Sequence, residues 1–289
     1  MDIFLQLFFR SLETGSVYAL AALGLIIIFR TSSVIHYAQG TMGMFSTFVV
    51  AVAAASLPLG ISVLLGVGVA VILGVLVDIL VIRRAKRLDP IGVQIITLGL
   101  LMVFLGIAPA FFGVDPLPMP KFIASGELKI GTASLSYNGL FNIALSLVIM
   151  LALFFTLQKT KLGLAIRMTA ENSTTARMMG VPVRNITMFA WAVGGVLGCL
   201  SGVMVAPTTS VQLTLMDSVI TAALISCLFG GVQSFIGPVV AAYILGIARN
   251  FMMFYVSTAW GEQLFYIFIL LFIVVRPNGL IGKKVIKKV

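Results

Sequence analysis

Residues 61–82 read ISVLLGVGVAVILGVLVDILVI, a run of 22 residues in which Asp78 is the only charged side chain. About 20 apolar residues is the length that crosses the hydrocarbon core of a bilayer as an α-helix. Comparable runs recur along the whole chain, whereas the alternation of polar and apolar residues that is typical of a membrane β-barrel does not. We therefore predict an all-α fold, a polytopic transmembrane helical bundle of about eight to nine membrane segments with broken or half helices.

The composition also indicates a membrane protein. Of the 289 residues, 60% are hydrophobic and 10% are charged, and the mean hydropathy is +1.16. A soluble domain carries about 25% charged residues. The first residues lack the basic region and the small-residue cleavage site of a signal peptide, so we expect the first span to serve as the insertion signal. The net charge of +10 is explained by basic loops that stay in the cytoplasm, and it does not point to nucleic acid.

The apolar runs divide the chain, which we expect to form a single transmembrane domain over residues 1–289, into nine segments. The seventh segment is short for a full crossing and is typical of a half-helix or of one arm of a broken span. The predicted segments are about 3–29, 42–57, 61–82, 92–112, 137–157, 186–205, 218–229, 239–256 and 262–275.

Basic residues predict the orientation, because Lys and Arg collect in cytoplasmic loops. Three stretches hold 14 of the 19 Lys and Arg residues, and they fall on one side of the membrane if the fourth and fifth spans form a hairpin. The C-terminus and a central loop at about 159–185 are then cytoplasmic, and the interval at about 113–136 is extracytoplasmic. The side of the N-terminus depends on whether the second segment crosses or is re-entrant. The 14 residues are Arg83, Arg84, Lys86, Arg87, Lys159, Lys161, Arg167, Arg177, Arg184, Arg276, Lys283, Lys284, Lys287 and Lys288.

No enzyme signature is found in the sequence. The stretch from Gly279 to Lys284 lacks the glycine spacing and the Ser or Thr that a phosphate-binding loop requires, so we expect the chain to hydrolyse no ATP by itself. His36 is the one histidine, which excludes a histidine metal cluster. Cys199 and Cys227 lie in apolar runs and are expected to be buried apolar side chains. We predict a protein that is not an enzyme and that binds no metal or cofactor of its own.

Five charged residues lie within or beside apolar runs, where a charge is a functional hypothesis by default. Asp78 is close to Arg83 and is expected to pair with it or to snorkel. Asp217 is expected to start a helix. Glu13 and Arg249 fit neither explanation, and a role in substrate binding or gating stays open for both. The five are Glu13, Asp78, Asp217, Arg249 and Glu262.

Two glycine-containing breaks interrupt the spans. Non-helical backbone at membrane depth is tolerated where protein or a water-filled cavity satisfies it, so the breaks predict a substrate path, with plain surface loops as the alternative. A weak internal similarity, of residues 16–40 to residues 218–237, is consistent with the repeats and broken helices of transporters. The predicted path residues are His36, Tyr37, Gln39 and Gly40 in the first break and Gln233, Ser234 and Gly237 in the second.

The central basic loop contains a predicted short helix. Asn172 or Ser173 is expected to cap it and Gly180 to end it, with Pro182 just beyond. Thr175, Met178 and Met179 are expected to share a face with Met168, while Glu171 and Arg177 point elsewhere. Two interpretations stay open: a helix lying on the anionic lipid of the inner leaflet, or a docking helix for a cytoplasmic partner with methionine anchors.

Four short motifs, in order along the chain, resemble the integral-membrane permease subunits of branched-chain amino acid ATP-binding-cassette importers. The resemblance covers nearly the whole chain. One departure is the first break, which reads HYAQG at residues 36–40 where the family commonly has Asn-Phe-Ala-His-Gly. The matching motifs are Gly15-Ser-Val-Tyr18-Ala-Leu-Ala-Ala-Leu-Gly24; Gly163…Arg167…Ala170-Glu171-Asn172…Ala176-Arg177…Gly180-Val181; Gly230-Gly231…Ser234…Gly237-Pro238; and Arg276-Pro277-Asn278-Gly279-Leu280…Gly282.

The resemblance implies a multi-pass subunit of a bacterial inner (plasma) membrane that translocates branched-chain or other hydrophobic amino acids. It implies a second permease subunit, two cytoplasmic ATP-binding subunits that carry ATP and Mg, and a periplasmic solute-binding protein. Relatives assigned to urea, amides or aromatic acids are the alternative. The loop then holds the helix that couples to the ATPases, with Arg167, Glu171, Asn172, Arg177, Met178, Met179 and Gly180 as its residues.

Two other classes of membrane protein also stay open. An ion-coupled secondary carrier or a channel would transport by itself, with no need for ATP. A structural membrane subunit would have no transport path at all.

Overall fold

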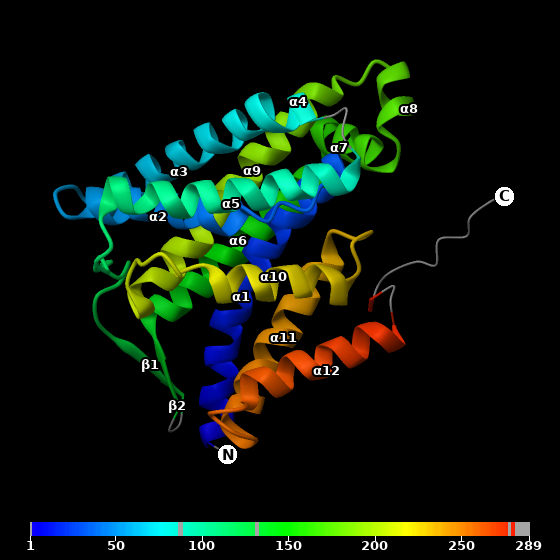
Figure 1. The fold of residues 1–289 in the computed structure, drawn as a ribbon. Coiled ribbons are helices and arrows are strands. Elements are labelled where there is room, and N and C mark those ends of the chain that lie inside the picture. The colour runs from blue at the N-terminus through cyan, green and yellow to red at the C-terminus, as the bar shows by residue number, and fades with distance from the viewer. Residues whose placement is uncertain (1, 86–88, 131–132, 277–278, 281–289) are drawn as a thin grey trace.

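The computed structural model describes residues 2–85, 89–130, 133–276 and 279–280, and it is an all-α bundle with one small β-hairpin (Figure 1). A π-helical turn, η1 (Val77–Ile82), joins α3 to α4, and the hairpin precedes α6. The elements are α1 (Asp2–Ser32), α2 (Gln39–Ala54), α3 (Leu59–Leu76), α4 (Arg83–Ala85), α5 (Pro90–Phe112), β1 (Glu127–Ile130), β2 (Ala133–Ser136), α6 (Tyr137–Lys159), α7 (Lys161–Glu171), α8 (Ser173–Met178), α9 (Val183–Thr209), α10 (Asp217–Gly230), α11 (Ile236–Tyr255) and α12 (Gly261–Val275).

Within the described residues, six helical segments are long and apolar enough to cross a membrane: α1, α3 continued through α4, α5, α6, α9 and α11. Three apolar helices are shorter, α2 with 16 residues, α10 with 14 and α12 with 15. Each of the nine predicted apolar segments coincides with one of these nine helices. The prediction of a polytopic helical bundle is therefore confirmed.

The core of the bundle is built on α1 and α9. In the most apolar stretch of each helix, 78% of α1 and 61% of α9 is buried, against 33% or less in the other four long helices. The other four present most of their apolar surface outward, as expected of helices that face lipid. The two central helices cross where Gly24 meets Gly194, because a Cβ added to either glycine would lie within 3.3 Å of the carbonyl oxygen of the other.

Glycines of α9 make its close backbone contacts with α2 and α3. Gly198 lies against the backbone of α2, where a Cβ at Gly43 would come within 2.7 Å of the Gly198 carbonyl oxygen. Gly202 faces Thr47 of α2, and Gly195 lies against the Ala70 backbone of α3. Small residues let membrane helices approach closely enough to gain packing energy. These glycines therefore let α9 pack closely on α2 and α3.

The bundle has two chemically different ends. We call the end with β1 and β2 the hairpin end, and the end with α4, α7 and α8 the basic end (Figure 1). The N-terminal part of α1 lies at the hairpin end, because Glu13 accepts a hydrogen bond of 3.0 Å from Asn142 at the start of α6. At the basic end, Arg83 of α4 donates to the carbonyl oxygen of Arg184 at the start of α9, at 3.1 Å.

Helices α1 and α2 are repeated, in the opposite direction, by α9 and α10. Helix α1 runs to the basic end and α2 returns, whereas α9 runs to the hairpin end and α10 returns (Figure 1). Thr47 of α2 packs on Gly202 of α9, and Cys227 of α10 packs on Ala22 of α1. Thr47 and Cys227 are 180 positions apart, and so are Ala22 and Gly202. Inverted repeats of this kind are common in transporters.

One further contact follows the same relation. Gly40 of α2 faces Ile220 of α10, its counterpart 180 positions later, so this contact lies on the pseudo-two-fold axis. The predicted internal similarity, of residues 16–40 to residues 218–237, had the wrong register. The similarity matched α1 to α10, whereas the repeat matches α1 to α9. The repeat is recognised by the directions of the helices and by their contacts, and these cannot be read from the identity of single residues.

The glycine contact between α2 and α9 predicts that a large side chain at Gly43 destabilises the protein more than one at a glycine with open space around it. Gly43→Leu places a side chain against the Gly198 backbone, which cannot move aside, and overpacking of this kind costs about 1–3 kcal/mol. For a chain of this size we expect a melting temperature lower by about 2–10 °C, measured by tryptophan fluorescence in detergent. Gly68→Leu on α3 is the control, because nothing lies within 4 Å of its Cβ position. Equal melting of the two variants would contradict the contact.

Candidate functional site

The central basic loop, at about 159–185, forms two helices, α7 and α8. The Thr160 side chain caps α7 by accepting from the backbone nitrogen of Gly163 at 3.0 Å. Asn172 caps α8 by accepting from the backbone nitrogens of Thr174 and Thr175, both at 3.0 Å. Gly180 has a φ of +82°, which L side chains rarely adopt. The predicted cap at Asn172 and the stop at Gly180 are confirmed.

The structure divides the predicted coupling residues between these helices. Arg167 and Glu171 belong to α7, and Arg177 and Met178 belong to α8. The sequence predicts a single short helix that begins at Asn172 or Ser173. The structure adds α7 before it, and Asn172 lies between the two helices. The two helices form a corner that projects from the basic end (Figure 1).

Methionines dominate the projecting surface of α8. Met178 is 76% exposed and the adjoining Met179 is 68% exposed, while Ala176 is 1% exposed and packs inward. Large apolar side chains exposed beside charged ones are typical of contact surfaces, and methionine adapts its shape to a partner. Arg177, also exposed, adds a positive charge to the same turn.

A cavity of about 880 Å³ lies directly behind α7. It contains Arg167 and Glu171 from α7 and also Gln233 and Ser234 from the second break. The structure thus brings together two sets of residues that the sequence predicted for different roles, the coupling segment and one half of the substrate path.

Arg30, at the end of α1, connects α1 to the second break inside this cavity. Its guanidinium donates to the backbone carbonyl of Gln233 and lies 4.7 Å from the centre of the Phe235 ring. Glu171 lines the same cavity. Sequence analysis missed Arg30, and the signal that could have found it is an arginine in the last turn of a predicted membrane helix.

The second break contacts Gly279 and Leu280, which follow α12 in the chain. The backbone nitrogen of Leu280 donates to the carbonyl oxygen of Phe229 at 2.7 Å. Gly231 and Gly279 both have positive φ, +94° and +72°, and a Cβ at Gly279 would lie 2.6 Å from the Gly231 nitrogen. Gly231 and Gly279, 48 positions apart in the chain, therefore belong to one compact contact. Gly237, the remaining predicted path residue here, is buried against Gly230.

The first break lies elsewhere, inside the bundle. His36 is 1% exposed, its ring centre is 4.4 Å from that of Trp191, and its Nε2 is 3.1 Å from the sulfur of Met42. This residue lies in the connection between α1 and α2, where burial lowers the pKa of the imidazole to about 3 and keeps it neutral at physiological pH. Gln39 donates to the Ala21 carbonyl at 3.1 Å.

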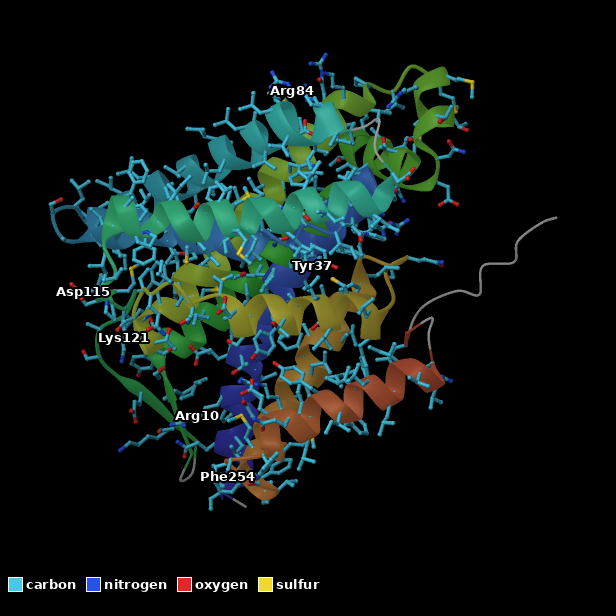
Figure 2. All side chains as sticks on the ribbon, viewed as in Figure 1. Arg10, Tyr37, Arg84, Asp115, Lys121 and Phe254 are labelled. Carbon is cyan, nitrogen blue, oxygen red and sulfur yellow. The ribbon has the colours of Figure 1, made fainter. Side chains whose placement is uncertain are left out.

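The two halves of the predicted substrate path are therefore not in one place. Gly40 packs on α10 and the half-buried Tyr37 lies within the bundle (Figure 2). The second break opens on the cavity at the basic end, whereas the first break is packed against protein.

The predictions for Asp78, Asp217 and the two cysteines agree with the structure. Asp78, 1% exposed, accepts from Arg83 Nε at 2.7 Å. Asp217 begins α10. Cys199 and Cys227 are both free and buried. Among the described residues, no group of three or more His, Cys, Asp and Glu side chains could hold a metal ion.

Comparison with known proteins gives one family. The family model described as "Branched-chain amino acid transport system / permease component" matches residues 7–275. A "Probable branched-chain amino acid transport permease protein LivH" of Methanocaldococcus jannaschii is 25% identical, covering 94% of this chain and 91% of the relative. The "High-affinity branched-chain amino acid transport system permease protein LivH" of Escherichia coli K12 is 22% identical, covering 99% and 98%.

One solved structure is similar in fold. It is "PsaBC from Streptococcus pneumoniae in complex with Fab", with a TM-score of 0.50 and 12% sequence identity, covering 97% of this chain and 92% of that one. At this identity the likeness concerns the fold alone.

The contact of Arg30 with the second break makes a testable prediction. Arg30→Met removes both the hydrogen bond to Gln233 and the charge over Phe235. We expect backbone amides of residues 231–235 to exchange with deuterium about tenfold faster, since a loss of about 1.4 kcal/mol in local stability has this effect. Arg84→Met, which removes an exposed arginine from the same end, should leave the exchange unchanged. Equal exchange in wild type and Arg30→Met would show that Arg30 does not hold the break.

Proposed function

The chain belongs to the branched-chain amino acid transport permease family, and we propose that it translocates branched-chain or other hydrophobic amino acids as the membrane subunit of an ATP-driven importer. The match of the family over residues 7–275 supports this proposal most directly. The relatives named above cover almost the whole chain and carry branched-chain amino acid transport in their names. Permeases for urea, amides or aromatic acids are the alternative within the same class of transporter.

The energy for transport comes from partner subunits in this proposal. The sequence has no glycine-rich loop that ends in Lys and Ser or Thr, the pattern that cradles nucleotide phosphates. ATP and Mg would therefore be bound by two cytoplasmic subunits, which dock on this chain and on a second permease subunit. A periplasmic solute-binding protein would deliver the amino acid.

The orientation follows the basic residues. The basic end faces the cytoplasm, together with the C-terminus, and the hairpin end faces outward. Because the start of α1 lies at the hairpin end, the N-terminus would be outside. The protein would then be a multi-pass component of a bacterial inner membrane, with the segment at 113–136 and its hairpin placed to meet the binding protein.

The docking surface for the ATPases is the α7–α8 corner. Met178 and Met179 are exposed enough to enter a groove on a partner, and a methionine-rich surface tolerates the small shape changes of an ATPase cycle. Arg177 would pair with an acidic group on the partner. Contact with anionic lipid is the competing interpretation of the same surface.

The corner is mechanically connected to the spans. Gly163 of α7 lies against the carbonyls at the end of α6, with a Cβ position 2.6 Å from the Leu157 carbonyl carbon. Glu171 lies in the cavity that also contains Arg30 and Gln233. A displacement of α8 would thus reach α1 and the second break through direct contacts. In this mechanism Gln233, Ser234 and Gly237 belong to the moving part of the solute path, while His36, Tyr37, Gln39 and Gly40 form its fixed part.

Charge reversal on α8 tests the docking surface. We expect Arg177→Glu to lower leucine uptake at least tenfold and to abolish stimulation of the ATPases, because like charges would face each other at the contact. Membrane insertion should be unchanged, as measured by the amount of protein in the membrane fraction. Lys159→Glu makes the same change of charge at an exposed position at the end of α6 and should transport normally. Normal uptake and ATPase stimulation in Arg177→Glu would refute docking at this surface.

The partner requirement is tested by reconstitution. We expect the chain purified alone in liposomes to show no leucine uptake, with or without a gradient of protons or sodium. Affinity purification from the native membrane should recover an ATPase and a second permease with it, and the recovered complex should take up leucine only with ATP. Uptake by the chain alone that collapses with the ion gradient would identify a secondary carrier.

A further inference from the structure

A second cavity, of about 730 Å³, opens at the hairpin end between α1, α9, α10 and α11. Its residues on α1 follow the spacing of one helix face and include Arg10, Glu13 and Tyr18. Helix α11 contributes Arg249 and Asn250 from the other side. Figure 2 shows Arg10 and Phe254, both part of the lining, at the end of the bundle opposite Arg84.

Glu13 is the unusual residue of this cavity. Its Oε1 accepts a hydrogen bond of 3.0 Å from Asn142, which is 1% exposed. In the part of the chain that the structure describes, no basic side chain lies within 4.0 Å of the Glu13 carboxylate, whereas Asp78 and Glu262 each have an arginine at 2.7 Å. A half-buried carboxylate in a membrane-spanning helix is stabilised by a cation, and the cavity leaves room for a cationic group of a ligand.

Arg249, across the cavity, can donate a hydrogen bond to a ligand. Its Nη1 donates to the Tyr18 hydroxyl at 3.0 Å and its Nη2 to Glu262 at 2.7 Å. Each Nη carries a second N–H, and the Arg249 side chain is 18% exposed, so these N–H groups are the donors that a ligand in the cavity can reach. Since guanidinium nitrogens match the geometry of a carboxylate, this cavity presents an acceptor for an ammonium group on α1 and a donor for a carboxylate on α11.

The rest of the lining is largely apolar. Val17, Met204, Val205, Val219 and Met253 form an apolar wall around Glu13 and Arg249, and the exposed Arg10 is a third charged residue of the lining. Small-molecule sites have volumes of about 300–1,000 Å³ and combine apolar walls with a few polar groups that fix the orientation. The cavity therefore fits a small ligand that has an apolar part, one ammonium group and one carboxylate.

We propose that this cavity binds an α-amino acid with an apolar side chain, with Glu13 accepting hydrogen bonds from its ammonium group and Arg249 donating to its carboxylate. The substrate class rests on the proposed function, and the site itself rests on the cavity and the charges of Glu13 and Arg249. Its position at the hairpin end makes it the place where an amino acid enters the spans. Asn142 positions the Glu13 carboxylate, and Glu262 and Tyr18 position the guanidinium of Arg249.

The test measures binding by the full chain in lipid nanodiscs, without partner subunits. Displacement of tritiated L-leucine is compared for unlabelled L-leucine, 4-methylpentanoate, which lacks the ammonium group, and 3-methylbutylamine, which lacks the carboxylate. We expect L-leucine to displace at least tenfold better than either analogue. Glu13→Gln keeps an oxygen for the hydrogen bond from Asn142 but removes the charge, so leucine should bind at least tenfold more weakly.

The controls separate charge from folding. Glu127→Gln, an exposed acid of β1 in the outer hairpin, should bind leucine as the wild type does. Thr208→Trp fills the cavity from an exposed position on α9 and should abolish binding, which provides a second test if Glu13→Gln does not fold. Absence of leucine binding by the wild type, unchanged binding in Glu13→Gln, or unchanged binding in Thr208→Trp would each overturn the proposal.

The result is independent of the coupling experiments. Leucine binding that needs Glu13, together with normal uptake in Arg177→Glu, would support the site and refute the docking surface. ATP-dependent uptake by the complex, together with no binding by this chain, would support the importer and refute the site.

Discussion

The approach of α1 and α9 at Gly24 and Gly194 is the constraint on which the rest of the structure depends. In a bilayer, helices gain little by burying apolar surface against each other, because lipid is equally apolar, so close packing and interhelical hydrogen bonds hold them together. The two central helices can touch only where neither has a side chain. Their crossing then places the other helices: α2 and α3 pack on α9, and α10 and α11 pack on α1.

The inverted repeat places side chains of different size at equivalent positions. Trp191 of α9 is 180 positions after Ser11 of α1, and the two occupy equivalent places in the repeat. At the basic side the large indole, fully buried, fills the space together with His36. At the hairpin end the equivalent residue is Ser11, which is also fully buried. The repeat thus keeps the backbone arrangement while side chains at equivalent positions differ in size, and a cavity lies at each end of the bundle.

The sequence predicts those features that a few neighbouring residues determine. The membrane helices follow from apolar length, the start of α8 from the Asn172 cap, and the Asp78–Arg83 pair from a spacing of five residues in one helical segment. Sequence reasoning missed features set by contacts between distant segments. Neither the link from Arg30 to Gln233 nor the contact of Leu280 with Phe229 is encoded in any short stretch. The register of the repeat was missed for the same reason, since the equivalent positions share packing and not residue type.

Helices α1 and α11 line both cavities, and this gives a physical route between the two ends. Helix α1 places Glu13 at one end and Arg30 at the other, and its 31 residues span about 46 Å at 1.5 Å per residue. Helix α11 places Ile236 at the basic end and Arg249 at the hairpin end. The two helices pack closely in their hairpin-end halves, because Gly15 lies against the Tyr243 backbone and Gly246 lies against Gly15 and Ser11. Closely packed helices transmit displacement as rigid bodies. A push on α7 that reaches Arg30 must therefore change the shape of the cavity around Glu13 as well.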